Sequence, residues 1–151
     1  MTGLLSYELF IAKTSGGNSW FTPEGGLYEM FINDTGSSSV KGTIVYVSPL
    51  FDNAVSIAPP QTSAAIGVIY EDGVPKGSMV KVVVSGKAQV LLKDNNASVR
   101  GYWCGVSDVP GRMYQLAYPA DFYEHFRQIG YSLEQKSGGE DLLSLVQLIF
   151  N

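Results

Sequence analysis

The chain has 151 residues, of which 45% are hydrophobic and only 16% are charged, and its formal net charge at pH 7 is −4. The ten basic residues form no run, which argues against a groove that follows a nucleic-acid backbone. A single cysteine, Cys104, excludes an intrachain disulfide and a cysteine-based zinc site. We expect one domain, because the length suits one core, and association with other chains, because so little charge covers its surface.

The first thirteen residues, "MTGLLSYELFIAK", lack the basic start of a secretory signal, and their short apolar run contains Glu8. No stretch approaches the roughly 18–20 uncharged apolar residues of a membrane span. We therefore expect a soluble protein that is made in a reducing cytoplasm and contacts no membrane.

The N-terminal thirty residues are rich in aromatic side chains and carry two linker-like stretches, "TSGGNS" (14–19) and "TPEGG" (22–26). Aromatic residues without regular periodicity are typical of anchors for another surface. The alternative is an N-terminal strand that completes the same domain. We predict an extended arm over residues 1–26, followed by a domain over 27–151.

Beyond the arm, the pattern predicts strands. Between Val80 and Leu92, apolar residues alternate with polar ones, as in a sheet with one buried face. Gly86 interrupts this run, which predicts a sharp bend there. Further strands are expected at 42–48, 54–58, 65–71, 99–107, 112–117, 129–135 and 142–150. Short strands at this spacing predict an all-β sandwich or, with corners like that at Gly86, a small β-barrel.

One six-residue frame occurs twice, as "IGVIYE" at 66–71 and "IGYSLE" at 129–134. Each copy leads into a glycine-containing turn and another apolar stretch, so the sequence predicts the same hairpin built twice. Glu71 and Glu134 hold equivalent positions in the two copies, and we expect both to satisfy turn amides.

Helical character is confined to "PADFYEHFRQIG" (119–130), where Pro119 suits a first turn and Gly130 a stop. About two turns are marginal without packing, so we expect a short helix or a loop.

The sequence carries no catalytic motif. His125 is the only histidine, and there is no G-x-S-x-G element, phosphate loop, dinucleotide fingerprint or metal-ligand spacing. Most carboxylates occupy predicted turns, where they serve backbone geometry. We expect no cofactor, no metal and no enzyme activity; a small hydrolase using Glu71 with Glu134 is the least favoured reading.

Four stretches together resemble the capsid decoration, or cement, proteins of tailed bacteriophages: "TPEGGLYEMFINDTGSSSVKGTIVYVS", "AAIGVIYEDGVPKGSMVKVVVSGKAQVLL", "RGYWCGVS" and "HFRQIGYSLEQ…LLSLVQLIFN". The resemblance covers roughly residues 22–151 and consists of strand frames rather than chemical signatures.

The resemblance implies a small β-barrel, or β-tulip, with an extended N-terminal arm. It also implies a homotrimer on the outer capsid surface of a virion, where it stabilises the head by bridging major capsid protein subunits. We expect the aromatic residues of the arm and its junction to contact the capsid: Tyr7, Phe10, Trp20, Phe21 and Tyr28.

An alternative function is a carbohydrate- or receptor-binding β-module displayed on a virion or tail, with Tyr102, Trp103 and Tyr114 as a stacking platform. Because neighbouring residues of a strand point to opposite faces, Tyr102 and Trp103 would not share one platform.

Overall fold

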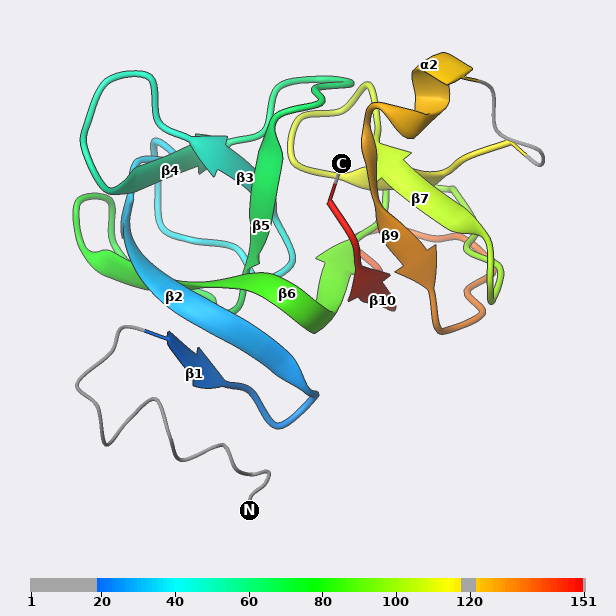
Figure 1. Cartoon of the computed structure of the whole chain (residues 1–151), viewed down its shortest axis with the longest axis horizontal. Helices are drawn as coiled ribbons and strands as arrows, with labels where there is room; N and C mark the ends of the chain where they lie inside the picture. Colours follow the sequence, from blue (N-terminus) through cyan, green and yellow to red (C-terminus); the bar gives the residue numbers. More distant parts are fainter. Residues whose placement is uncertain (1–18, 118–121, 151) are drawn as a thin grey trace.

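The computed structural model describes residues 19–117 and 122–150. These residues form ten strands and one short helix, α2 (Phe122–His125) (Figure 1). The strands are β1 (Ser19–Phe21), β2 (Gly26–Asn33), β3 (Ile44–Val47), β4 (Ala54–Ile57), β5 (Ala65–Ile69), β6 (Met79–Leu91), β7 (Trp103–Val106), β8 (Met113–Gln115), β9 (Gln128–Ser132) and β10 (Leu143–Leu148). The expected all-β fold is confirmed.

Five strands form a closed barrel in the order β2-β4-β3-β5-β6, with β6 pairing back onto β2. Closure depends on a short parallel pairing in which Ile32 and Asn33 of β2 lie beside Ala54 and Val55 of β4. The predicted small β-barrel is thus present. β1 adds to β2 outside the ring, with Trp20 opposite Tyr28.

The long strand β6 belongs to two parts of the molecule. Its first half pairs with β2 and β5, and from Gly86 onward it pairs with β10. Gly86 has a φ of +80°, and a Cβ there would collide with the carbonyl oxygen of Gly25. The bend predicted at Gly86 is confirmed, and it starts a second sheet in the order β6-β10-β9-β7-β8 (Figure 1).

Each part has its own apolar core. The barrel interior contains Val45, Val55, Ile69, Val80 and Val82, with Phe31 packed against them. A larger core lies between the barrel wall and the second sheet and includes Ile44, Val68, Val83, Val90, Cys104, Met113, Ile129 and Val146. Adjacent residues of β6, Val82 and Val83, therefore point into different cores.

The repeated frame forms equivalent hairpins, β5–β6 and β9–β10, both antiparallel. Glu71 Oε1 accepts a hydrogen bond from the backbone amide of Lys81 at 3.3 Å, and Glu134 Oε1 accepts one from Leu145 at 2.9 Å. The two glutamates thus have equivalent roles, as predicted, but the amides that they bind belong to the following strands β6 and β10 rather than to the turns.

Two local predictions differ from the structure. No strand was expected near 27–33, yet β2 lies there and places Phe31 against the barrel interior. By contrast, the short helix expected within residues 119–130 is confirmed as α2, which spans Phe122–His125. Within the predicted arm, residues 19–26 form β1 and a turn in which the Gly26 amide donates to Thr22 Oγ1 at 2.9 Å. Residues 1–18 lie outside the described part.

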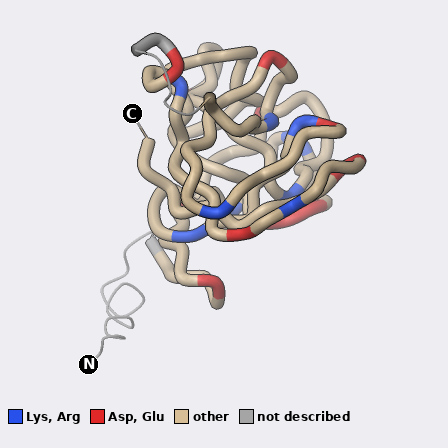
Figure 2. The backbone as a smooth tube through the Cα atoms, turned by 90° about the vertical axis from the view of Figure 1, so that its right-hand side faces the viewer, with Lys and Arg blue, Asp and Glu red and all other residues tan. Residues whose placement is uncertain are grey.

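Charged residues are sparse along the described backbone, and the two signs interleave (Figure 2). Among the residues that the structure describes, no helix is long and apolar enough to cross a bilayer.

Candidate docking surface

Three aromatic rings form a ladder across β1, β2 and the residue after β5. Trp20 and Tyr28 are stacked with ring centroids 5.7 Å apart, and Tyr28 and Tyr70 are nearly parallel, at 5° and 6.3 Å. Lys81 and Lys41 place their ammonium groups 5.3 Å and 5.2 Å from the Tyr28 and Tyr70 ring centroids. Because these rings stack on one another, the ladder fastens β1 to the barrel more than it offers ring faces to a partner.

The Tyr70 hydroxyl donates a hydrogen bond to Glu24 Oε1 at 3.1 Å, which ties the β1–β2 turn to the end of β5. Burial raises the pKa of the Tyr70 phenol, and the bond to Glu24 raises it further. The phenol therefore stays protonated as a donor throughout the neutral pH range.

The predicted capsid-contact residues are separated by the fold. Trp20 and Tyr28 are half-buried in the ladder, whereas Phe21 has 52% of its surface exposed. Tyr7 and Phe10 lie outside the described residues. Of the three predicted contacts that the structure describes, Phe21 is the most available to a partner.

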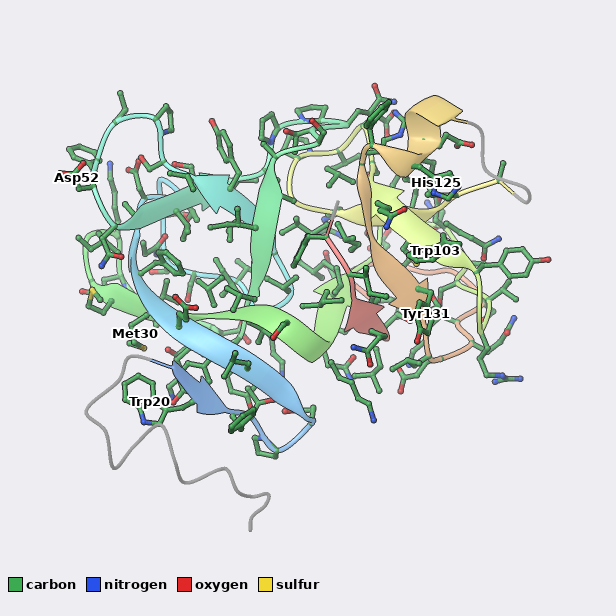
Figure 3. The ribbon with its side chains drawn as sticks, in the orientation of Figure 1. Trp20, Met30, Asp52, Trp103, His125 and Tyr131 are labelled. Carbon is green, nitrogen blue, oxygen red and sulfur yellow. The ribbon has the colours of Figure 1, made fainter. Side chains whose placement is uncertain are left out.

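A second exposed apolar group lies at the turn between β3 and β4, and sequence reasoning missed it. Val47, Leu50 and Phe51 are 57%, 75% and 57% exposed. We call these three residues, with Pro49, the apolar tip. Figure 3 marks its position by Asp52, which follows Phe51 in the chain and lies far from Trp20 in that view. Two large apolar side chains exposed side by side in a turn are uncommon on a free surface.

A hydrogen-bond network holds the apolar tip in place. Ser48 Oγ accepts from the amides of Leu50 at 3.1 Å and Phe51 at 3.2 Å, and it donates to Asp34 Oδ2 at 2.7 Å. Ser56 Oγ donates to the Asp34 backbone carbonyl at 3.0 Å. The turn thus has its polar groups bonded internally while its apolar side chains point outward, which is a preorganised shape for binding.

Beside the apolar tip lies a groove of about 230 Å³ lined by Ile32, Asn33, Asp34, Phe51, Lys76 and Gly77. Because Phe31 and Val80 pack into the barrel interior, the alternation of the strands places Met30, Ile32 and Met79 on the outer face. We call Met30, Ile32, Met79 and Phe51 the outer strip; Met79 is 44% exposed.

One signal for the apolar tip was present in the sequence. "VSPLFDN" (47–53) has a serine that can bond the amides two and three residues on, and it has Leu-Phe where a turn between strands is usually polar. The groove had no such signal, because Lys76 and Gly77 meet β2 only through the barrel closure.

The residues of the predicted carbohydrate platform are only partly brought together. Trp103 meets Tyr131 and His125 edge-on, with centroids 5.6 Å and 6.2 Å away (Figure 3). Gly105 separates Trp103 from Tyr114 on one face of the second sheet, because Gly105 and Tyr114 are paired. Tyr102 lies just before β7 and is half-buried.

The polar side chains of this face are held in pairs. The Arg127 guanidinium lies 5.6 Å from the Tyr114 ring centroid, and the Tyr114 hydroxyl donates to Glu124 Oε2 at 3.3 Å. His125 Nδ1 is 2.9 Å from Gln128 Oε1. The His125 ring is thus held by its contacts with Gln128 and Trp103.

Cys104 meets Ser132 in the core, with Sγ and Oγ 3.1 Å apart. Burial raises the pKa of the Cys104 thiol to about 11, and the contact with Ser132 opposes that rise only in part. The thiol is therefore protonated and enclosed, which makes it inert toward substrates.

Arg112 joins two loops of the second sheet. Its guanidinium contacts Asp94 at 3.0 Å and Asp141 at 2.7 Å. It also donates to the Leu92 carbonyl at 3.2 Å. A hollow of about 190 Å³ beside it is lined by Arg112 and Asp141 and by Lys41, Asp72 and Leu143. Within residues 19–117 and 122–150, no group of three or more metal-ligating side chains occurs.

No protein-family model and no curated protein matches this sequence.

Proposed function

We propose that this chain is a structural virion protein that binds the outside of a tailed-phage capsid and stabilises it by bridging major capsid protein subunits. The observation that supports this most is the apolar tip. A turn whose hydrogen bonds hold Leu50 and Phe51 outward suits a partner's apolar pocket, since buried anchors of this kind dominate interface energy.

Bridging needs at least two separate contacts on one rigid body. The apolar tip provides one, and the exposed Phe21 on β1, with the aromatic residues Tyr7 and Phe10 of the preceding segment, provides the other. A closed barrel between them keeps their separation fixed. Assembly into a homotrimer would multiply both contacts, so that modest single contacts give tight attachment through effective concentration.

The test is co-sedimentation of the purified chain with empty expanded heads built from the major capsid protein encoded with it. Leu50→Asp/Phe51→Asp should weaken binding about 30-fold or more, which corresponds to roughly 2 kcal/mol. Val109→Asp, which changes an exposed apolar residue in the β7–β8 loop, is the matched control and should bind normally. Unchanged sedimentation of the double variant would remove the apolar tip from the interface.

A second measurement tests the other contact and the assembly. Phe21→Asp should weaken capsid binding without lowering solubility, because its side chain is already exposed. The mass of the free protein in solution, measured by light scattering, should be that of a trimer. A monomer that still binds heads would keep the docking proposal and remove the trimer.

A carbohydrate-binding module is the second candidate, and one observation favours it. The second sheet gathers Trp103, Tyr131 and Tyr114 on one face with the planar polar groups of Arg127 and Gln128 nearby. Micromolar binding on a glycan array that Trp103→Ala abolishes would favour this candidate over capsid docking.

A further inference from the structure

We infer that copies of this chain join head to tail, with the loop 98–101 of one copy packed on Ile32 and Met79 of the next. The inference concerns copies of this chain alone, so it holds or fails independently of capsid binding. It starts from a repeat in the strand pairing, which divides the chain into a first unit, residues 26–85, and a second unit, residues 86–148.

The repeat covers every strand pairing of the barrel. The strands β2, β3, β4, β5 and the first half of β6 correspond to the second half of β6, β7, β8, β9 and β10, with the same partners and directions. Asn33 and Val55 pair in parallel where the barrel closes, and a parallel bridge between Leu92 and Met113 holds that place in the second unit. The ladders β3–β5 and β7–β9 also share a register shift, which follows the second pair in both.

The same loop precedes β3 and β7. It reads "SVKG" and ends at Gly42 in the first unit, and it reads "SVRG" and ends at Gly101 in the second. The two glycines have φ values of +91° and +85°. Their amides donate to the carbonyls of Ile69 and Ser132, at 2.8 Å in each case, and these two residues hold the fourth position of the repeated frame. The two loops therefore have the same backbone shape and the same attachment.

In the first unit this loop covers an apolar pair of the second unit. Leu91 of β6 and Leu143 of β10 are cross-strand partners. A Cβ on Gly42 would lie 2.5 Å from Leu143 Cδ2 and 3.1 Å from Leu91 Cγ, so the glycine packs directly on both side chains. Leu91 is only 6% exposed. This contact joins the two units, and it needs a residue without a side chain at its centre.

The first unit has the corresponding pair without the corresponding cover. Ile32 and Met79 are the last antiparallel pair of β2 and β6, the place that the covered leucine pair holds in the second unit. Met79 is 44% exposed. Among the residues that the structure describes, none lies within 4 Å of the Cβ position of Gly101. One unit thus has an apolar pair to be covered, and the other has the loop that covers such a pair.

A second copy of this chain is the partner that carries this loop. The loop belongs to the second unit and the pair to the first, and the open space at Gly101 shows that the two do not meet within one copy. Each copy therefore offers both halves of the contact at different places. Such a head-to-tail contact builds rings or filaments rather than two-fold dimers, and the proposed homotrimer is a ring of this kind.

The contact between copies should be weaker than the contact within the chain. The Leu91 amide donates to the Gly42 carbonyl at 2.9 Å, whereas the Ile32 amide is already bonded to the Asn53 carbonyl at 2.8 Å. Only the apolar part of the contact is therefore repeated between copies, without this hydrogen bond. Association should accordingly be reversible and should depend on protein concentration.

Light scattering over a dilution series of the full chain tests the contact. The mass of the wild type should rise with concentration. Gly101→Asn keeps a residue that tolerates positive φ but adds a side chain at the centre of the contact, and Met79→Asp places a charge on the apolar pair. Both variants should remain monomeric at concentrations where the wild type associates, and thermal unfolding shows whether they are folded.

Gly36→Asn is the matched control for the glycine variant. Gly36 has a φ of +91° and nothing within 4 Å of its Cβ position, so this variant carries the same change in backbone preference away from the contact. It should associate as the wild type does. A monomeric wild type, association that either variant leaves unchanged, or an equal loss in Gly36→Asn would overturn the inference.

Cysteine cross-linking identifies which surfaces meet. Met79→Cys and Arg100→Cys are made as separate proteins, and the buried Cys104 does not compete. Arg100 is exposed and corresponds to Lys41, which lines the hollow beside the covered leucine pair. Under mild oxidation an equimolar mixture should form mixed disulfide dimers. Each protein alone should stay monomeric, because the contact is head to tail.

Val109→Cys, at an exposed residue of the second unit, replaces Arg100→Cys in the control mixture and should form no dimer with Met79→Cys. Dimers of Met79→Cys alone would indicate a two-fold contact. That outcome, the absence of mixed dimers, or equal cross-linking at Val109 would each overturn the inference. Both measurements are made without capsids, so their failure leaves the proposed capsid docking to its own test.

Discussion

Two hairpins, β5–β6 and β9–β10, are built from the repeated frame. They share the residues near the ends of the frame and differ in those at its middle. In both, the frame's glycine lies where a Cβ would run into the following strand, against Val82 at Gly67 and against the Gln147 backbone at Gly130. In both, the final glutamate accepts an amide of that strand. The repeated residues thus encode how closely two strands approach and how they are joined.

The middle residues decide where each hairpin packs. The fourth position of the frame is Ile69 in one copy, which fills the barrel interior, and Ser132 in the other, which contacts Cys104. The backbones differ too, because Gly130 has a φ of +150° while no positive φ occurs at Gly67. The same six-residue frame therefore forms a hairpin in two different packing environments. The comparison shows that its fourth position can hold either an apolar or a polar side chain.

The largest effect is expected from replacing the two glycines. Gly130→Ala should destabilise by about 3 kcal/mol or more, because its Cβ would meet backbone and its φ is unfavourable for alanine. Gly67→Ala should cost about 2 kcal/mol, because part of its clash is with a side chain that can shift. Urea unfolding midpoints of the two variants measure the difference. A Gly67→Ala cost equal to or above that of Gly130→Ala would contradict the comparison.

A pH-dependent effect is expected from Cys104, which lies on β7 and contacts Ser132 of the second hairpin. The folded pKa of Cys104 is about 11 and its ordinary value is near 9, so the folded state holds the proton more tightly between these pH values. Stability should therefore fall as pH rises through this window, by up to about 1.4 kcal/mol per unit from this group. Cys104→Ala removes that slope.

Urea unfolding at pH 8, 9 and 10 measures this slope of stability against pH. The loss of unfolding free energy caused by Cys104→Ala should become smaller as pH rises. Ile69→Val, in the other hairpin's environment, is the control, and its cost should stay constant because no titrating group is involved. A constant offset between wild type and Cys104→Ala would show that the thiol does not titrate in this way.

The smallest effect is expected at the glutamates. Glu134→Ala should cost about 1 kcal/mol through loss of the Leu145 amide partner, and Glu71→Ala should cost less because its bond to Lys81 is longer. The glutamine variants keep an acceptor oxygen and should recover most of the loss. Thermal unfolding of the four variants measures these costs. A larger cost for Glu71→Ala than for Glu134→Ala would show that the hydrogen-bond length does not predict the loss of stability.

Much of the fold could be predicted because the alternation of apolar and polar residues and the bends at glycine are local signals in the sequence. The run containing Val80, Val82, Val90 and Leu92 predicted β6, and Gly86 predicted its bend. β2 escaped prediction because Tyr28, Met30, Phe31 and Ile32 are apolar or aromatic on both faces, so no period of two is visible. Apolar residues are needed on both faces of β2 only because this strand closes the barrel. Barrel closure depends on contacts between residues that are distant in the sequence.

The candidate docking surface was harder to predict, because it too depends on contacts between residues that are distant in the sequence. Aromatic residues near the N-terminus pointed to docking, but sequence could not tell that Trp20 and Tyr28 stack in a ladder while Phe21 faces outward. Nor could it show that Ser48 and Asp34, fourteen positions apart, hold Leu50 and Phe51 in place. Both features depend on which strands become neighbours.

The course of β6 through both cores has a mechanical consequence. A single continuous backbone from Met79 to Leu91 is the shared wall of barrel and second sheet, so no linker separates them at which one could swing against the other. Tension applied at the apolar tip would be carried as shear along that strand into β10. A body of this kind resists stretching as one unit, and it should melt in a single cooperative step.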